Sequence, residues 1–393
     1  MNRVRTPLLL ASYALAYSGA VIGYLPLLSL LLPLKVERIA GAARLDVLTA
    51  CMVAGAVVAS ASNILFGWLS DRAVARGRGR RGWLAAGGAM TAASYATLAL
   101  AQEPVAIVVA VVLFQAAINA LLAPLLAMMA EEVPDDRKGV AGGLLALAAP
   151  VAAAVSAGLV AAGGAGEAAQ LAVVAALALL CQLPLLTLRA RPLAAAPPAG
   201  AVPLLRRDLA IAWAARLLVQ AAGNAQSFYL LYYFSSIVAG ASSAALAPRV
   251  GSLLTLAFAA ALPVAMLLGR WSDRSGRRKP FLFAAALGGA AGLALMARAG
   301  DWNAGAAGFA LYAVGSATFL ALHAGFAMQL LPNPAHRGRD LGLLNLANTL
   351  PALAGPLLTW WLATPDDFGA VMAALSALTL IGGVLMLLVR GRA

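Results

Sequence analysis

Charged residues, cysteine and histidine are all scarce in this sequence. Only 11% of the 393 residues are charged, and there are two cysteines and two histidines. Both cysteines, Cys51 and Cys181, fall inside apolar runs, where they provide neither a disulfide framework nor a metal site. The sequence also lacks the catalytic motifs G-x-S-x-G and H-E-x-x-H. We therefore predict that the protein is not an enzyme and has no metal and no cofactor.

Hydrophobic residues are what the sequence has in excess. They make up 63% of the chain, and the mean hydropathy is +0.88, which excludes a soluble globular domain of this length. Runs of about 20 apolar residues, the length of helix that crosses a bilayer, recur with short polar breaks between them. The runs lack the strict alternation of strands, and unpaired backbone groups are too costly in lipid, so we predict helices. The twelve predicted spans are 7–34, 45–69, 82–102, 105–130, 140–163, 168–188, 209–238, 248–270, 280–299, 304–331, 341–364 and 368–389.

The basic residues determine the predicted orientation. Most of the 28 lysines and arginines lie at the chain ends and in alternate breaks between the apolar runs. Because basic loops stay on the cytoplasmic side, we predict a multi-pass protein of the inner (plasma) membrane with both termini in the cytoplasm. This topology also accounts for the net charge of +13. We expect the partners to be the lipid bilayer and a small-molecule substrate, and not nucleic acid.

Two short elements of the sequence occur twice. Gly67-Trp-Leu-Ser-Asp71-Arg72 returns as Gly269-Arg-Trp-Ser-Asp273-Arg274, an offset of 202 residues. Gly143-Leu-Leu-Ala-Leu-Ala148 returns as Gly342-Leu-Leu-Asn-Leu-Ala347, an offset of 199 residues. Two repeats at nearly the same offset predict two similar membrane halves. The predicted division is an N-terminal six-helix half at 1–188, a cytoplasmic linker rich in Pro and Ala at 189–208, and a C-terminal six-helix half at 209–393.

The repeated turn resembles the hallmark of the major facilitator superfamily, G-x-x-x-D-R-x-G-R-R between the second and third helices. The second copy matches from Gly269 to Arg278, and the first carries two extra residues after Arg72. The resemblance covers the whole chain. It implies an all-α membrane protein, with twelve transmembrane helices in two pseudo-symmetric six-helix halves, that works as a monomeric secondary transporter. It also implies gating residues in the turns: Gly67, Asp71, Arg72, Gly269, Asp273, Arg274, Arg277 and Arg278.

The aspartates of the two turns have a specific predicted role. A carboxylate near the N-terminus of a helix is stabilised by free backbone N–H groups and by the helix macrodipole. We expect Asp71 to dock on the start of the eleventh helix and Asp273 on the start of the fifth, which would close the cytoplasmic side. The alternative is that these charges only set topology and turn geometry.

In the superfamily the first, fourth, seventh and tenth helices line the central cavity, so polar residues on or near these helices are the candidates for substrate binding. At about 100° per residue, Tyr13, Tyr17 and Tyr24 fall within about 40° of one another and predict one aromatic stripe. The alternative is that such hydroxyl and amide groups join helices by hydrogen bonds. The full candidate set is Tyr13, Tyr17, Tyr24, Gln115, Asn119, Arg216, Gln220, Asn224, Gln226, Tyr229, Tyr233, Tyr312, Ser316, His323, Asn345 and Asn348.

The distribution of charge narrows the class of substrate. All 15 acidic residues lie in or beside loops, so a typical drug–proton antiporter with a buried carboxylate is disfavoured. The cationic candidates inside the spans are Arg216 and His323, at similar predicted depth. Arg216 would hold an anion through paired N–H donors, and His323 would act as a donor or a proton carrier. The alternatives are that Arg216 snorkels to the inner interface and that His323 is a packing residue.

The leading hypothesis is a secondary transporter that moves a small polar metabolite, an organic anion, by alternating access of its two halves. A sugar or glycoside carrier is the second hypothesis, because aromatic faces stack on sugar rings and amides bond to hydroxyl groups. Export of neutral hydrophobic compounds is the third. The sequence leaves open whether a proton or another cation couples transport, as in a symporter, and whether the chain imports or exports. A membrane enzyme or a sensor finds no motif or added domain in its favour.

Overall fold

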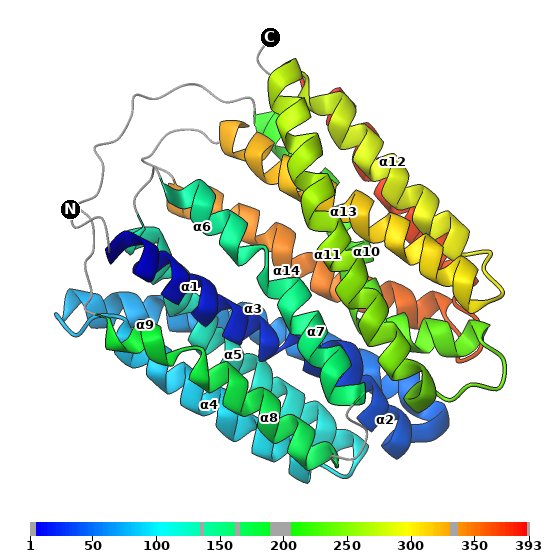
Figure 1. Cartoon of the computed structure of the whole chain (residues 1–393), viewed down its shortest axis with the longest axis horizontal. Coiled ribbons are helices and arrows are strands. Elements are labelled where there is room, and N and C mark those ends of the chain that lie inside the picture. The colour runs from blue at the N-terminus through cyan, green and yellow to red at the C-terminus, as the bar shows by residue number, and fades with distance from the viewer. Residues whose placement is uncertain (1–4, 134–136, 162–165, 189–205, 331–336, 391–393) are drawn as a thin grey trace. The chain divides into compact units, whose positions relative to one another are not determined.

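The computed structural model describes residues 5–133, 137–161, 166–188, 206–330 and 337–390. Almost all of these residues are helical, and their only β-contact is an isolated bridge between Thr364 and Asp367. The described part of the chain therefore confirms the all-α architecture (Figure 1).

The helices before residue 189 alternate between long rods and short, interrupted pieces (Figure 1). They are α1 (Arg5–Ile22), a π-helix (Leu27–Leu31), α2 (Leu32–Ala40), a 3-10 turn (Gly41–Ala43), α3 (Arg44–Ala75), α4 (Arg81–Leu100), α5 (Pro104–Glu132), α6 (Lys138–Leu145), α7 (Ala148–Ala161), α8 (Glu167–Leu180) and α9 (Leu183–Thr187). The described helices from residue 206 onward include no such short pieces, and the shortest of them, α12, has 19 residues. They are α10 (Arg206–Ile237), α11 (Ser243–Ser275), α12 (Arg278–Met296), α13 (Trp302–Leu330), α14 (Arg337–Leu362) and α15 (Gly369–Leu388).

Each of the twelve predicted spans overlaps a helix. Among the described residues, eight helical segments are long and apolar enough to cross a membrane, and the longest, Pro7–Ala75, covers the first two predicted spans. The helices at the predicted spans 82–102, 209–238 and 341–364 are not among these eight. The second of them is α10, whose arginine, glutamine and asparagine side chains lower its hydropathy. The structure is therefore that of a multi-pass membrane protein.

The chain divides into two compact units, residues 1–195 with 247–255 and residues 196–246 with 256–393. Below, these are called the N-unit and the C-unit. The predicted linker at 189–208 lies outside the described residues as far as residue 205, so the predicted boundary of the halves stays a prediction.

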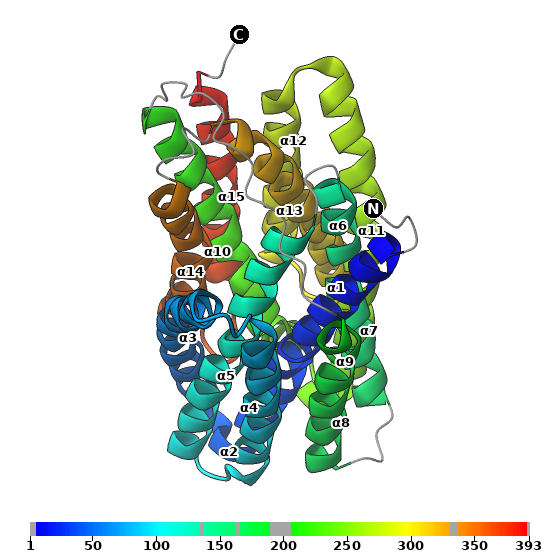
Figure 2. The same ribbon diagram turned by 90° about the vertical axis from the view of Figure 1, so that its left-hand side faces the viewer.

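In the N-unit, α5 packs along both α3 and α4, α8 packs against α4, and α1 lies against α7 and α8 (Figures 1 and 2). Glycine makes the closest of these approaches possible. A Cβ at Gly87 of α4 would stand 2.5 Å from the backbone nitrogen of Leu121 on α5. Around this contact a buried cluster forms, which includes Tyr13, Leu84, Leu121 and Leu125. The N-unit thus has its own apolar core.

In the C-unit, α12 packs on α13 and α15, and α10 packs on α14 and α15 (Figure 2). The backbones of α12 and α13 touch at glycines. A Cβ at Gly292 would lie 2.5 Å from the carbonyl oxygen of Gly308, and one at Gly315 would lie 2.4 Å from the nitrogen of Gly289. Small residues at such crossings let membrane helices gain close van der Waals contact, which replaces the hydrophobic effect as the force that holds helices together in lipid.

The first predicted span is not one continuous helix. α1 ends at Ile22, Gly23 and Tyr24 form a turn, and a π-helix begins at Leu27. Pro26 explains the break, because it has no N–H to donate to the carbonyl of Ile22 and its ring clashes there. Tyr13 and Tyr17 lie on α1 and Tyr24 lies in the turn, so the predicted stripe of three tyrosines on one helix face stays a prediction.

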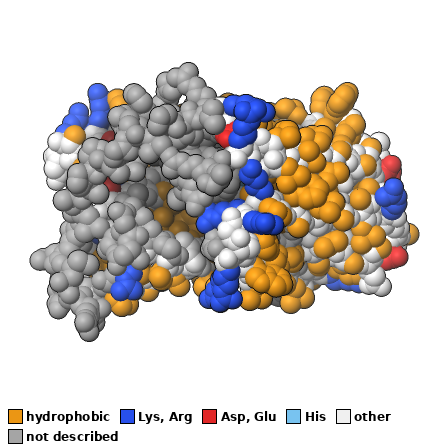
Figure 3. Space-filling view, turned by 90° about the horizontal axis from the view of Figure 1, so that it is seen from above, with side chains coloured by type: hydrophobic (Ala, Val, Ile, Leu, Met, Phe, Trp, Pro, Cys, Tyr) orange, Lys and Arg blue, Asp and Glu red, His pale blue; other side chains and the backbone are white. Residues whose placement is uncertain are grey.

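Many large hydrophobic side chains are exposed, as expected where the solvent is lipid. Ile64 of α3 is 71% exposed, Leu256 of α11 69% and Trp361 of α14 78%. Figure 3 shows hydrophobic side chains over a broad area of one face.

Candidate functional site

The two cationic candidates of the C-unit lie close together. Arg216 on α10 is half-buried and donates its Nε–H to Gln220 Oε1 at 3.1 Å. His323 on α13 is fully buried, and its Nε2 lies 2.7 Å from the carbonyl oxygen of Ala212, one turn before Arg216. Because a carbonyl oxygen only accepts, Nε2 must carry the proton. Arg216 and His323 therefore lie near each other where α10 packs on α13, and their similar depth in the membrane stays a prediction.

The contacts of His323 describe a positioning role. Its ring stacks on Phe319 at 5.6 Å between centroids, and its Nδ1 has no hydrogen-bond partner among the described residues. A second proton on the buried ring would therefore lack an acceptor there, which is costly. In this conformation His323 holds α13 against α10 beside Arg216, and Arg216 and Gln220 are the half-buried members of this cluster.

A second group of candidates on α10 faces the interior of the C-unit. Gln226 donates its Nε2–H to the Met372 sulfur at 3.0 Å, and Tyr233 donates its hydroxyl to the Met296 carbonyl at 2.9 Å. Tyr229 is buried between them. These hydrogen bonds tie α10 to α15 and to the end of α12, which is the helix-joining role that polar side chains also have in membranes.

The remaining described candidates of the C-unit also meet α10. Tyr312 and Ser316 of α13 are buried, and the Tyr312 hydroxyl lies 3.5 Å from the place where a Cβ of Gly223 would stand. Asn224 lies where α14 approaches, since a Cβ at Gly355 would come within 3.4 Å of its own Cβ. The side chains of Asn345 and Asn348 lie outside the described residues.

In the N-unit the polar candidates form a bridge between α3 and α5. Asn119 donates to the Gln115 carbonyl at 2.9 Å, and its Oδ1 accepts from Asn63 Nδ2 at 3.2 Å. The Gln115 side chain lies against Gly55 of α3. Asn63 was missed by sequence reasoning, although a mid-span asparagine on the second helix is itself a signal for an interhelical hydrogen bond.

The tyrosines of the first span have different surroundings. Tyr13 is buried in the N-unit core near Glu132 at the end of α5, and its hydroxyl has no hydrogen-bond partner among the described residues. Tyr17 packs against that core and is half-buried, as is Tyr24 beyond the break.

A network of charges joins three helices at the end of the N-unit that is predicted to be cytoplasmic. Buried Arg80 lies 2.6 Å from Asp71 Oδ1 and 2.6 Å from Glu131 Oε1, and it also donates to the Ser70 hydroxyl at 2.7 Å. Hydrogen bonds that the Arg80 guanidinium donates to the Glu131 carboxylate raise the pKa of Arg80. The next residue, Arg81, pairs with Glu132 at 2.8 Å. The end of α3, the start of α4 and the end of α5 are thereby fastened together.

This network gives Asp71 a partner within its own unit. Its predicted docking on the eleventh helix stays a prediction, since the side chains at the start of α14 lie outside the described residues, as does that of Asp273. The sequence contains a signal for the network. Two adjacent arginines directly precede the third predicted span, and two adjacent glutamates directly follow the fourth.

Comparison with known proteins gives a consistent result for the fold. The family model described as Major Facilitator Superfamily matches residues 240–393. The structure resembles that of a mutant of the nucleoside transporter NupG, with a TM-score of 0.73, 12% identity, and coverage of 98% of this chain and 100% of that one. None of the curated proteins matches the sequence.

Two further solved structures share the fold. The D-xylose-proton symporter has a TM-score of 0.66 at 16% identity, over 96% of this chain and 95% of that one. A bacterial homolog of the human lysosomal transporter Spinster, in an inward-facing and unoccupied conformation, has a TM-score of 0.65 at 14% identity, over 99% and 95%. Residues 240–393 thus match the Major Facilitator Superfamily model, and nearly the whole chain shares its fold with these solved transporters.

The two repeated turns differ in length. In the second turn, the N-cap of the next helix, Arg277, follows Asp273 by four residues, whereas in the first turn Arg80 follows Asp71 by nine. Counted from the aspartate to the N-cap, the first turn is therefore longer by five residues. Gly276 of the second turn has a φ of 64°, and Gly77 and Gly79 of the first have φ values of 74° and 67°. The match of the first turn to the motif with two extra residues stays a prediction.

The other expected gating residues are exposed or half-buried. Gly67 and Gly269 are half-buried; a Cβ at Gly67 would meet nothing within 4 Å, and one at Gly269 would meet only Leu322 at 4.0 Å. Arg72 stacks over the Trp68 ring at 4.0 Å, and Arg274 and Arg277 are exposed. Arg278 is half-buried at the start of α12. The predicted gating role of these residues remains a proposal.

Proposed function

We propose that this chain is a secondary transporter of the inner membrane that moves a small organic anion by alternating access. The fold, the family and the apolar helices support transport in general. The observation that carries the substrate class is the pair Arg216–Gln220 on α10, half-buried and held beside His323.

A guanidinium at this place suits an anion for a physical reason. Arginine offers several N–H donors in a planar fork that matches a carboxylate or a phosphate, and such charge-assisted bonds are strong where water is scarce. Gln220 engages the Nε–H, so it orients the guanidinium plane along α10. The sequence places none of the 15 acidic residues in the middle of a span, so a cationic substrate finds no carboxylate there.

Thermal stabilisation of the purified protein tests this proposal, because a ligand that binds the folded state raises Tm by mass action. The panel contains mono- and dicarboxylates, sugar phosphates, neutral monosaccharides and neutral hydrophobic compounds. We expect an anion to stabilise the protein, and we expect Arg216→Ala to weaken its binding by about 10- to 100-fold, the value of losing a hydrogen bond to a charged group. Arg216→Lys keeps the charge without the fork and should fall between the two.

The matched control is Arg207→Ala, which removes an exposed arginine from the inner end of the same helix. It should bind the anion as the unaltered protein does. Counterflow in proteoliposomes with the same anion then tests transport itself. Stabilisation by a neutral sugar or a neutral amphiphile that survives Arg216→Ala would overturn the anion proposal and leave the sugar carrier or the exporter.

Coupling is a separate part of the proposal. The fold relative at 16% identity is described as a D-xylose-proton symporter, and we propose that a proton or another cation also drives transport here. Uptake of the stabilising anion should then depend on a pH gradient or a cation gradient imposed on the vesicles. Uptake that ignores both gradients would make the protein a facilitator.

A further inference from the structure

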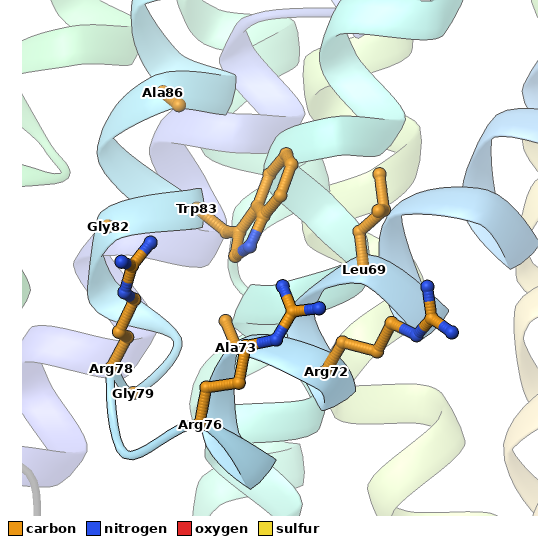
Figure 4. Close-up of a pocket in the computed structure, with 9 residues that line it drawn as sticks. All are labelled: Leu69, Arg72, Ala73, Arg76, Arg78, Gly79, Gly82, Trp83 and Ala86. Carbon is orange, nitrogen blue, oxygen red and sulfur yellow. The ribbon is translucent and has the colours of Figure 1, made fainter.

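A cavity at the inner end of the N-unit contains three arginines. It has a volume of about 320 Å³ and lies between the end of α3 and the start of α4. Arg72, Arg76 and Arg78 line it together with Trp83 and Leu69. Figure 4 shows Trp83 and the guanidinium of Arg76 between Arg72 on one side and Arg78 on the other. The cavity therefore combines a high positive charge with an apolar wall.

Three acidic residues at this end of the N-unit, Asp71, Glu131 and Glu132, pair with arginines that do not line the cavity. Asp71 lies 2.6 Å from Arg80, and both glutamates at the end of α5 are bound by Arg80 and Arg81. Arg72 lies over the ring of Trp68, at 4.0 Å from its centroid. Within the described residues, no salt bridge joins Arg76 or Arg78 to a carboxylate. The positive charge of the cavity is thus left for a ligand.

The backbone conformation of the turn constrains the positions of Arg76 and Arg78. α3 ends in a Schellman motif, in which the Arg78 N–H bonds to the Ala73 carbonyl and the Gly77 N–H to the Val74 carbonyl, both at 2.9 Å. Gly77 has a φ of 74°, a value that favours glycine. Arg76 and Arg78 therefore flank a fixed left-handed residue, which constrains where their side chains start.

The repeat within the chain shows that this segment is not needed to make the turn. The second turn connects α11 and α12, the counterparts of α3 and α4 in the repeat. Counted from the aspartate to the N-cap of the following helix, it is five residues shorter than the first turn. The additional residues of the first turn are the ones that carry Arg76 and Arg78. A turn-forming role alone does not account for them.

The cavity lies at the boundary between the membrane and the cytoplasm. The predicted spans 45–69 and 82–102 end and begin beside it, on the side that the basic loops mark as cytoplasmic. Beyond it on α3, Trp68 is 48% exposed and Ile64 71% exposed. An apolar, exposed helix surface thus leads away from the cavity into the bilayer.

We propose that this cavity binds the phosphate of an anionic phospholipid of the inner leaflet. Arg76 and Arg78 donate N–H groups to the phosphate oxygens, as guanidinium groups do to phosphates elsewhere. Trp83 packs against the glycerol region at the depth where tryptophan is favoured, and the acyl chains lie along the apolar surface of α3. The bound lipid would stabilise the turn between α3 and α4, independently of which substrate is transported.

Native mass spectrometry of the purified full chain tests the proposal, with phosphatidylglycerol titrated into detergent micelles and phosphatidylcholine as the neutral comparison. We expect bound phosphatidylglycerol at concentrations where phosphatidylcholine is not retained. The variant Arg76→Gln/Arg78→Gln should bind at least 5-fold more weakly, and Arg76→Lys/Arg78→Lys should recover part of the loss. The control Arg207→Gln/Arg270→Gln removes the same charge from two exposed cytoplasmic arginines and should bind as before.

Two results would overturn the proposal. Equal retention of phosphatidylglycerol by the Arg76→Gln/Arg78→Gln variant and by the control would show that lipid binding does not use the cavity. Displacement of the lipid by millimolar inorganic phosphate or glycerol phosphate would assign the cavity to a soluble anion. Since Arg76 and Arg78 lie outside the Arg216 site, anion stabilisation by the transport substrate should be unchanged in the variant, so the two proposals fail separately.

Discussion

At the scale of single residues, glycine decides how closely α12 and α13 pack. A methyl group at Gly292 would lie 2.5 Å from both the Gly308 carbonyl oxygen and the Tyr312 nitrogen, which are backbone atoms that cannot rotate away. Gly292→Ala should therefore lower the stability of the protein, by about 1–3 kcal/mol as is usual for overpacking. A lower Tm in detergent is the measurement.

Gly288→Ala is the matched control for this prediction. Gly288 lies one turn earlier on α12, and a Cβ there would meet nothing within 4 Å. Alanine favours a helix over glycine by about 1 kcal/mol, so this variant should be as stable as the parent or slightly more stable. Equal Tm values for the two variants would contradict the close backbone contact.

Arg80 bonds to three side chains of the charge network, those of Asp71, Glu131 and Ser70. Replacing it by Gln leaves Asp71 and Glu131 without their shared cation. Because both carboxylates stay in contact with water, the N-unit should lose about 1–3 kcal/mol, the range for hydrogen bonds to a charged group. Glu131→Gln leaves the pair with Asp71, which is exposed on its acidic side, and should cost less. Denaturation of the two variants in detergent, followed by loss of helical signal, gives the comparison.

The pH dependence of this contribution has a definite sign. Because the folded state raises the pKa of Arg80, its stabilising effect is fully present below the ordinary arginine pKa. It is lost only as the pH rises through the still higher folded value. From the arginine alone, the stability difference between the parent and Arg80→Gln should be constant between about pH 7 and pH 9. A difference that falls with rising pH in this range would contradict the assignment.

At the scale of elements, the break in the first span depends on a hydrogen bond from another helix. Tyr95 of α4 donates its buried hydroxyl to the carbonyl oxygen of Gly23 at 2.6 Å, and its ring packs edge-on against Phe114. Tyr95→Phe keeps the ring contact and leaves the Gly23 carbonyl without that donor. We expect a loss of about 1–3 kcal/mol in the free energy of unfolding, the cost of an unsatisfied buried group.

Thr91→Val on the same helix is the control for Tyr95→Phe. It also deletes a buried hydroxyl, but that hydroxyl bonds to the Gly87 carbonyl of its own helix at 2.8 Å. Such a carbonyl keeps its helical N–H partner, so the cost should be smaller. If Thr91→Val lowers Tm as much as Tyr95→Phe does, the link between α4 and the break is not what stabilises it.

The elements themselves could be predicted from the sequence because membrane helices are set by local hydropathy. The break at Gly23–Tyr24 was also within reach, since Pro26 is a local signal. Pairings across the chain were not. Arg80 and Glu131 are 51 residues apart, and the sequence contains other acids that could have served Arg80 equally well. Helical phase alone separates Gln226 and Tyr233 from Arg216 and Gln220 on α10. Which of the two faces is buried depends on tertiary packing, and the sequence does not specify it.

At the scale of the whole molecule, the orientation in the membrane is the prediction with the widest consequences. The distribution of basic residues places both termini, the two motif turns and the proposed lipid cavity on the cytoplasmic side. The chain is convenient for testing this, because Cys51 and Cys181 are its only cysteines. In a background of Cys51→Ala and Cys181→Ala, Gln102→Cys labels the turn between α4 and α5, and Arg207→Cys labels the start of α10, both at exposed positions.

A membrane-impermeant maleimide should react with the Gln102→Cys variant in intact cells and with the Arg207→Cys variant only after the membrane is permeabilised. The two sites are comparable in exposure, so a difference in reaction reports the side of the membrane and not burial. The reverse labelling pattern would invert the topology, and with it the lipid proposal, since the arginine cavity would then face the outer leaflet. Labelling of both sites in intact cells would mean that the segments between them cross the membrane an even number of times. The three predicted spans between the two sites, from the fourth to the sixth, require an odd number.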